Sequence, residues 1–473
     1  MDTNACMIIG GLLEKSENER ILTNKYTGDV IGKVYEANES QVNLAVQSAK
    51  EQFNKIELSP YERYSILLKA SQLTREYKEG IAEIMVKESG MTFKDAVGEI
   101  ERAIQTFILS AEEAKRITGE VLPANANPGM ENRIAFTMRV PVGVVCAITP
   151  FNAPFNNVVH KVAPAIAAGN TVVLKPSSQT PLSAIKVIEI LHEAGLPKKH
   201  VNVVFGEAEV GGWLLSNKDI NFYTFTGSTK VGEIIKTNSG LRRVALELGN
   251  NSATIVAKDV DLDLAVPIIV KAAFRKAGQV CVSLQRIYAD STIANELETR
   301  LKEEILKLKV GNPFEKDTDV GPLIDERKAR DLENWIKEAK DKGARIVTGG
   351  ERSGTLFQPT LIADAKQEMK VVCQEVFGPL LSIVKYENID EAINLVNDSE
   401  YGLQAGVFTN DLNLAMKVAK KLDVGGVNIN ETSNTRFDAM PYGGVKSSGI
   451  GREGPKYAIE EMTETKIIQM NLI

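Results

Sequence analysis

Three side chains in this sequence have types and settings that suit acyl chemistry: Cys281, Glu247 and Asn152. A cysteine thiolate is a nucleophile, although a free cysteine is more often a small buried hydrophobic residue. Glu247 lies in the apolar run VALELG, where a carboxylate is either salt-bridged or has a raised pKa that suits a general base. Asn152 stands between Pro150 and Pro154, so its backbone is rigid and its amide could donate to an oxyanion. Taken singly, each also has an ordinary structural interpretation.

Two further patterns place ligand-binding groups at the ends of predicted strands. The segment FYTFTGSTKVGEII predicts a strand, a turn at residues 226–228, and a helix with Gly232 in its first turns. Free N–H groups at a helix N-terminus stabilise a phosphate. Lys175 ends the predicted strand of NTVVLKP, at the sheet edge where parallel sheets bind ligands. The alternatives are a turn that binds nothing and a solvated surface lysine, and the fingerprint G-x-G-x-x-G is absent.

Apolar strand-like runs alternate with helical runs, the order typical of parallel α/β sheets. Strands are expected within residues 143–149, 170–176, 201–206 and 222–227, with a helix at 181–197 between the second and third. Another helix is expected over 39–53, with Ser40 as its N-cap. The order recurs at 252–256 and 405–422, and 473 residues exceed what one core accommodates. The fold class is therefore α/β with at least two domains.

Two segments have the period of antiparallel strands. Ile134, Phe136, Met138 and Val140 alternate within 132–140, which predicts one buried face. The segment 463–473 is also strand-like. These segments form either a small local sheet or an arm that bridges subunits, because an open strand edge invites pairing with another chain.

Charge and cysteine content narrow the class of protein. The net charge is −6 and the pI is near 5.5, which disfavours binding to nucleic acid or to an acidic membrane surface. Four cysteines without a C-x-x-C motif indicate reduced thiols in the cytoplasm. We find no targeting signal and no membrane-span pattern. The three histidines, His160, His192 and His200, show no metal-ligand grouping, so no metal is expected.

Seven motifs occur in one order along the chain: ITPFN, KPSS, FTGSTKVG, LELG, GQVC, EVFGPL and PYGGVKSSGIGRE. In this order the chain resembles the NAD(P)-dependent aldehyde dehydrogenases, especially members that act on lactaldehyde, phosphonoacetaldehyde or succinate semialdehyde. The resemblance implies a Rossmann-like cofactor domain (1–118 and 141–247), an α/β catalytic domain (248–456) and a small β oligomerisation arm (119–140 and 457–473). It favours the bridging arm over the local sheet and implies a homodimer or homotetramer.

The resemblance also implies a mechanism. Cys281 attacks the aldehyde as a thiolate, and the Asn152 side chain and the Cys281 backbone N–H hold the oxyanion of the thiohemiacetal. Hydride passes to the nicotinamide and leaves a thioester, which is hydrolysed by water that Glu247 activates. An unperturbed thiol is only a few per cent ionised at neutral pH, so the site is expected to favour the anion.

For the cofactor, NADP, NAD or both, the resemblance assigns ten residues: Thr149, Pro150, Lys175, Ser178, Gly227, Ser228, Gly232, Leu248, Glu375 and Phe377. Many NAD-preferring members carry glutamate at the position of Ser178. Serine removes a charge that repels a 2′-phosphate, so we expect NADP to be accepted, alone or beside NAD. Asn250 replaces a frequent family glycine and is expected to be tolerated, because asparagine adopts left-handed conformations readily.

The substrate is a small aldehyde. The segment NETSNTRFDAMPYGG resembles the substrate loop of lactaldehyde dehydrogenases. Small Ala153 follows Asn152 and favours a short hydroxyaldehyde such as lactaldehyde or glycolaldehyde. Arg102 and Arg436 either meet an anionic group or are salt-bridged, so succinate semialdehyde, phosphonoacetaldehyde and glyceraldehyde 3-phosphate are alternatives. Glu247 argues against a CoA-acylating enzyme, and the presence of all three catalytic candidates argues against a non-catalytic scaffold.

Overall fold

Apolar runs buried on both faces build the central strands of the first sheet. In the computed structural model, which describes residues 4–55 and 57–472, all five residues of β7 are buried. The five middle strands, β9, β8, β7, β10 and β11, are parallel, as the sequence predicts. Antiparallel strands close both edges. The strand order is β2 (Leu12–Glu14), β1 (Met7–Ile9), β9 (Val201–Val203), β8 (Thr171–Lys175), β7 (Val144–Ile148), β10 (Phe222–Thr226), β11 (Arg243–Glu247) and β23 (Gly449–Ile450).

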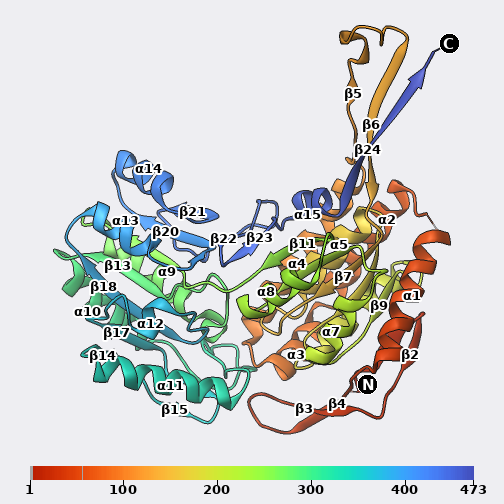
Figure 1. Cartoon of the computed structure of the whole chain (residues 1–473). Coiled ribbons are helices and arrows are strands. Elements are labelled where there is room, and N and C mark those ends of the chain that lie inside the picture. The colour runs from red at the N-terminus through yellow and green to blue at the C-terminus, as the bar shows by residue number, and fades with distance from the viewer. Residues whose placement is uncertain (1–3, 56, 473) are drawn as a thin grey trace.

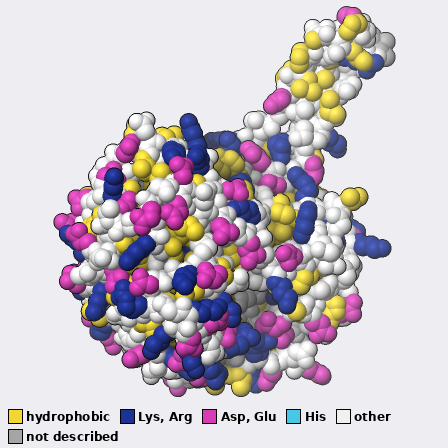
Figure 2. All heavy atoms as spheres, turned by 60° about the vertical axis from the view of Figure 1, so that its left-hand side comes forward, with side chains coloured by type: hydrophobic (Ala, Val, Ile, Leu, Met, Phe, Trp, Pro, Cys, Tyr) yellow, Lys and Arg dark blue, Asp and Glu magenta, His cyan; other side chains and the backbone are white. Residues whose placement is uncertain are grey.

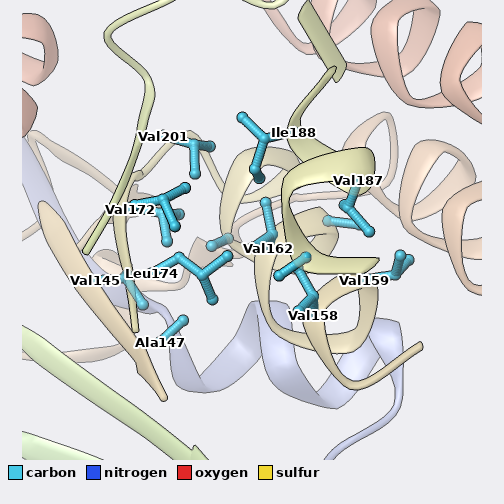
Figure 3. Packing of buried hydrophobic residues seen from close by; sticks show 14 of the residues in the cluster. Val145, Ala147, Val158, Val159, Val162, Val172, Leu174, Val187, Ile188 and Val201 are labelled. Atoms are coloured by element: carbon cyan, nitrogen blue, oxygen red, sulfur yellow. The ribbon is translucent and has the colours of Figure 1, made fainter. Parts of the chain in front are cut away.

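Helices cover both faces of this sheet (Figure 1). They are α1 (Glu39–Lys55), α2 (Pro60–Glu76), α3 (Lys78–Ser89), α4 (Phe93–Ala114), α5 (Asn156–Ala167), α6 (Pro181–Glu193), α7 (Ala208–Ser216), α8 (Thr229–Asn238) and α15 (Pro455–Glu461). Figure 3 shows how the core forms where α5 and α6 face the strands: Val158 and Val162 of α5 lie between Val187 of α6 and the strand residues Val172 and Leu174. Continuous burial of this kind explains why the strand sequences lack polar alternation.

The predicted cap of α1 is wrong. Ser40 lies inside the helix, and the Asn38 side chain instead accepts a hydrogen bond from the Gln41 backbone N–H at 3.0 Å. The Gln41 side chain accepts from the Asn38 N–H in return, at 3.2 Å. This reciprocal pair satisfies two N–H groups that a helix start leaves free.

A second sheet forms the other lobe, again mainly parallel. Its order is β14 (Arg345–Thr348), β17 (Thr360–Ala363), β18 (Leu380–Tyr386), β13 (Arg286–Asp290), β12 (Ala253–Val256), β20 (Gln404–Phe408) and β21 (Gly426–Ile429). Only β14 pairs antiparallel, at the edge. Its helices are α9 (Leu262–Phe274), α10 (Ala294–Ile305), α11 (Glu326–Asp341), α12 (Lys370–Cys373), α13 (Ile389–Asn397) and α14 (Leu412–Lys421), and the short 3₁₀ helix η2 covers Arg275–Gly278.

Both antiparallel segments pair with each other in a separate sheet that projects from the first lobe (Figure 1). Strand β6 (Arg133–Pro141) pairs with β24 (Thr463–Asn471) along its whole length, and β5 (Val121–Leu122) adds to its other edge. Ile134 and Met138 of β6 are 42% and 44% exposed, so the predicted buried face is open in the single chain. Figure 2 shows hydrophobic side chains gathered along this arm.

Smaller pairs complete the fold. The hairpin of β3 (Glu19–Thr23) and β4 (Val30–Tyr35) runs along the first lobe. Two pairs of two-residue strands form locally: β15 (Arg352–Ser353) with β16 (Leu356–Phe357), and β19 (Tyr401–Gly402) with β22 (Val445–Lys446). Within the described residues, no helix has both the length and the apolar character needed to cross a membrane. The domain boundaries given by the sequence stay a prediction. Helix α15, which spans the predicted boundary at residues 456 and 457, packs on α4 and α5 of the first lobe before the chain enters β24.

Candidate active site

The carboxyl ends of β7, β10 and β11 face the loop that carries Cys281, and together they line a pocket with an empty volume of about 1260 Å³, its open mouth included. All three catalytic candidates line this pocket, as do both substrate candidates, Arg102 and Arg436. Six cofactor candidates also line it: Pro150, Gly227, Ser228, Leu248, Glu375 and Phe377. The other four, Thr149, Lys175, Ser178 and Gly232, lie outside its lining. Convergence at this sheet edge is what parallel topology predicts.

A left-handed turn presents Cys281. Lys276, Ala277 and Gly278 have φ angles of 50°, 52° and 70° in succession. At Gly278 a Cβ atom would lie 2.0 Å from the Gly378 carbonyl oxygen, so only glycine fits there. Left-handed backbone costs roughly 1–2 kcal/mol for each non-glycine residue. Strain of this kind persists where the surrounding structure holds it, commonly at functional sites.

Cys281 is half-buried and its Sγ lies 3.0 Å from the Tyr442 hydroxyl oxygen. Burial raises the pKa of the Cys281 thiol to about 11, although the Tyr442 hydrogen bond and the Arg436 charge act to lower it. The surroundings therefore hold a neutral thiol at pH 7. This differs from the expectation that the site favours the anion, because desolvation outweighs the two favourable neighbours.

Asn152 is fixed beside the Cys281 loop. Its Nδ2 donates to the Gln279 carbonyl at 2.9 Å, and its Oδ1 accepts from Asn157 at 3.4 Å. A side-chain amide has two N–H donors, so one remains for an oxyanion after the bond to Gln279 is made. The bond to Gln279 thus fixes the amide beside the Cys281 loop.

A buried ion pair ties these two loops together. The Lys276 ammonium contacts the Glu99 carboxylate and also donates to the Asn152 carbonyl at 3.2 Å. The other Glu99 oxygen accepts from the Phe155 and Asn156 backbone N–H groups, both at 3.1 Å. Glu99 therefore caps α5 while Lys276 holds the Asn152 loop. Sequence reasoning missed this pair, because Glu99 lies far from Lys276 in the chain.

Glu247 ends β11 and is 5% exposed. In the described structure its Oε2 has no hydrogen-bond partner. Burial first, and then the nearby Glu453 carboxylate, raise the pKa of Glu247 well above its usual range. A carboxylate whose proton affinity is raised in this way suits general-base chemistry near neutral pH.

Glu453 behaves in the opposite way. Burial acts to raise the pKa of Glu453, but the charges of Lys161 and Arg436 hold it well below its usual range. Lys161 contacts it at 2.9 Å and Arg436 at 3.2 Å. The two neighbouring carboxyl groups therefore differ in proton affinity: the pKa of Glu247 is raised and that of Glu453 is lowered.

Both predicted substrate arginines have carboxylate partners. Arg102 meets Asp438 at 2.6 Å, and Arg436 meets Glu453 and lies over the Tyr442 ring with 3.6 Å between its Cζ and the ring centroid. The sequence did not single out Tyr442, although it lies inside the motif PYGGVKSSGIGRE. A further cation, Arg275, lines the same pocket and donates to the Asn434 side chain at 3.1 Å.

Several features fit a bound dinucleotide. The hydroxyl oxygens of Ser178 and Thr149 are buried and, in the described part of the chain, have no hydrogen-bond partner. At Gly232 a Cβ atom would lie 2.3 Å from Leu248, so glycine lets the α8 start approach β11 closely. Glu375 accepts from the Asn250 N–H at 3.0 Å, and burial raises the pKa of Glu375 to about 7. These residues and Lys175 would hold the cofactor.

Two details differ from the sequence argument about the cofactor. Asn250 does not have a positive φ; its side chain is buried and donates to Ser252 Oγ at 2.5 Å. Burial lowers the pKa of Lys175, and Glu207 is the charge that most opposes this effect. A carboxylate therefore remains near Lys175 although residue 178 is serine, and Arg20 pairs with that Glu207 carboxylate at 3.2 Å.

The aldehyde dehydrogenase family profile matches residues 13–468, so the chain belongs to the aldehyde dehydrogenase family. Among curated relatives, the 3-sulfolactaldehyde dehydrogenase of Priestia aryabhattai is 52% identical over 467 residues, 98% of each chain. The lactaldehyde dehydrogenase of Methanococcus vannielii is 42% identical over 468 residues, 98% of this chain and 99% of the relative.

Solved structures confirm the fold. The NADP-dependent glyceraldehyde-3-phosphate dehydrogenase of Bacillus halodurans C-125, complexed with NADP, superposes with a TM-score of 0.96 at 37% identity, covering 99% of this chain and 100% of that one. Betaine aldehyde dehydrogenase of Staphylococcus aureus, in complex with NAD+, gives 0.95 at 33% identity, covering 99% and 95%. The chain is therefore an NAD(P)-dependent oxidoreductase of this family.

Proposed function

We propose that this enzyme oxidises a short 2-hydroxyaldehyde with a negatively charged group at its far end, of which 3-sulfolactaldehyde is an example. The two curated relatives reported above are named for 3-sulfolactaldehyde and lactaldehyde, both of which are 2-hydroxyaldehydes. This substrate class combines the short hydroxyaldehyde and the anionic aldehyde that the sequence left as alternatives.

The charges that line the pocket carry this proposal. Arg102, Arg436 and Lys276 each contact a carboxylate, which offsets their charge. Among the described residues no carboxylate lies within salt-bridge distance of Arg275, which is half-buried at the pocket wall. A half-buried cation without a counter-ion is suited to a strong-acid group on a ligand. Arg275 and Asn434 are the proposed anchor for that group.

The positions of the three catalytic candidates support the roles proposed for them. Cys281 attacks the aldehyde carbon, and the free N–H of Asn152 donates to the oxygen that becomes negative. Glu375 and Phe377 would hold the nicotinamide end of the cofactor, which would supply the hydride acceptor. Glu247 then takes a proton from the water that attacks the thioester, which releases the acid and frees Cys281. Each assignment uses a group that lines one pocket.

An aldehyde panel tests the substrate class. Oxidation of 3-sulfolactaldehyde, lactaldehyde and glycolaldehyde, followed by reduced nicotinamide absorbance, should give the highest kcat/KM for the sulfonated aldehyde. Arg275→Gln should lower that value by roughly 10–100-fold, because a hydrogen bond to a charged group contributes about 1.5–3 kcal/mol. It should leave lactaldehyde nearly unchanged, and the exposed Arg327→Gln serves as the matched control. Equal losses for both aldehydes in Arg275→Gln would contradict the anchor.

We also propose that the chain forms a homodimer or homotetramer through the arm of β5, β6 and β24. The open face of β6 supports this, because Ile134 and Met138 expose apolar surface that a second copy would cover. Light scattering on Ile134→Lys/Met138→Lys should show a smaller species than the unmodified chain. An unchanged mass would contradict assembly through the arm.

Four cysteines without a disulfide, together with the acidic net charge, favour a cytoplasmic location, which cell fractionation tests.

A further inference from the structure

We propose that Tyr442 is a catalytic residue whose hydroxyl donates a hydrogen bond to the Cys281 thiolate and so favours formation of the nucleophile. This inference rests on the proposed role of Cys281. It adds a residue that the family resemblance did not assign, and it explains how a half-buried thiol with a raised pKa becomes reactive.

The contact is direct. The Tyr442 hydroxyl oxygen lies 3.0 Å from Cys281 Sγ, and Tyr442 is only 2% exposed. The two side chains also share a small apolar cluster with Val282 and Leu403, which keeps the ring in place. A buried hydrogen bond to an ion is stronger than one in water, because the local dielectric constant is low.

The charges around the pair decide the direction of that bond. Burial and the neighbouring Cys281 and Glu247 raise the pKa of Tyr442 well above its usual range, so its hydroxyl keeps its proton and can only donate to a thiolate. Facing Cys281 are also Arg436, which favours the anion, and Glu247 and Glu375, which oppose it. Tyr442 supplies the donor that touches the sulfur.

A buried network holds Tyr442 in this position. Arg436 lies over the tyrosine ring and is anchored by Glu453, which in turn is held by Lys161. Lys161 also donates to Thr224 at 3.1 Å, at the core of β10. The cation over the ring is an electrostatic attraction that a phenylalanine would retain. Removing only the hydroxyl therefore isolates the contact with sulfur.

The test measures thiol ionisation without any aldehyde. The rate of Cys281 alkylation by iodoacetamide is followed from pH 6 to pH 10 by peptide mass mapping, in the unmodified enzyme, Tyr442→Phe and the control Tyr386→Phe. Tyr386 is also buried, and its hydroxyl donates to the Val256 carbonyl at 3.3 Å, inside the second lobe. Tyr442→Phe should move the alkylation profile to higher pH by about one unit, a tenfold loss of thiolate at pH 7.5.

Three outcomes decide the matter. A shifted profile in Tyr442→Phe alone, with a matching fall in kcat/KM, supports the proposal. An unchanged profile overturns it, even if Tyr442→Phe lowers thermal stability, because a purely structural role would not alter ionisation. An unchanged profile with a raised KM for lactaldehyde but not for propanal also overturns it, and would instead assign Tyr442 to the substrate hydroxyl. If Cys281 proves unreactive and Cys281→Ala retains activity, the proposed function fails separately.

Discussion

Replacement of Lys276 by methionine tests how the two catalytic loops are held together. Lys276 is 7% exposed and Glu99 4% exposed, so the substitution leaves an unpaired carboxylate in the protein interior. Removal of one partner of a buried pair costs about 3–5 kcal/mol. The Phe155 and Asn156 N–H groups still donate to Glu99, so we expect the lower end of that range, about 3 kcal/mol.

Thermal unfolding followed by a fluorescent dye measures this loss. For a domain of this size, 1 kcal/mol corresponds to roughly 2–4 °C, so Lys276→Met should unfold roughly 6–12 °C below the unmodified protein. The Asn152 carbonyl also loses its ammonium donor, and kcat should fall with it. Exposed Lys337, on α11 and outside the pocket lining, provides the control Lys337→Met.

The energetic coupling between Glu99 and Lys276 gives a sharper test than the single substitution. Glu99→Gln with Lys276→Met should destabilise the protein less than the sum of the single substitutions, because the double variant leaves no buried charge unpaired. A midpoint for Lys276→Met within about 1 °C of the unmodified protein, which is roughly 0.25–0.5 kcal/mol, would refute the reasoning.

Three further predictions concern the cofactor, stability and the nucleophile. Ser178→Glu should shift kcat/KM strongly toward NAD, because a carboxylate about 4 Å from a 2′-phosphate costs roughly 4 kcal/mol per unit charge at an effective dielectric of 20; an enzyme that already rejects NADP several hundredfold would contradict this. Burial raises the pKa of Glu88 to about 7 from 4.5, so its contribution to folding is present below pH 4.5 and lost as pH rises through 7. The free energy of unfolding of Glu88→Gln should therefore rise by about 3 kcal/mol relative to that of the unmodified chain as the pH is raised from about 4.5 to about 8. Unfolding midpoints of both proteins at each pH measure this difference, and parallel pH curves would refute it. Cys281→Ala should fold and bind NAD(P)H, as measured by fluorescence, without oxidising aldehydes; substantial activity would remove Cys281 from the mechanism.

Much of the fold could be predicted because burial leaves a direct pattern in sequence. Strands buried on both faces appear as continuous apolar runs, as in β7. The alternation of apolar residues in β6 predicted an antiparallel strand, which is what the structure has. The N-cap of α1 could not be chosen correctly, because Asn38 and Ser40 both have capping side chains and only the backbone decides between them.

The candidate site was likewise only partly predictable from the sequence. Parallel topology brings the carboxyl ends of the strands to one edge of the sheet, so Asn152 after β7 and Glu247 at the end of β11 could both be placed at that edge. The contacts of Tyr442 with Cys281 and of Glu99 with Lys276 join residues remote in sequence, and no local pattern indicates them. Long-range ion pairs likewise decide which pocket cations are compensated, so the sequence could not separate Arg275 from the other arginines.

Single-turnover analysis of Glu247→Gln tests most directly that a Cys281 thioester forms and that Glu247 activates the water that hydrolyses it. The variant is mixed with lactaldehyde or 3-sulfolactaldehyde and NAD(P)+, and reduced nicotinamide is recorded while the protein is quenched for peptide mass analysis. We predict a burst of one reduced nicotinamide per active site, slow turnover afterwards, and an acyl group on the peptide that contains Cys281. Normal steady-state turnover with no acyl adduct, or an adduct on another residue, would contradict the account.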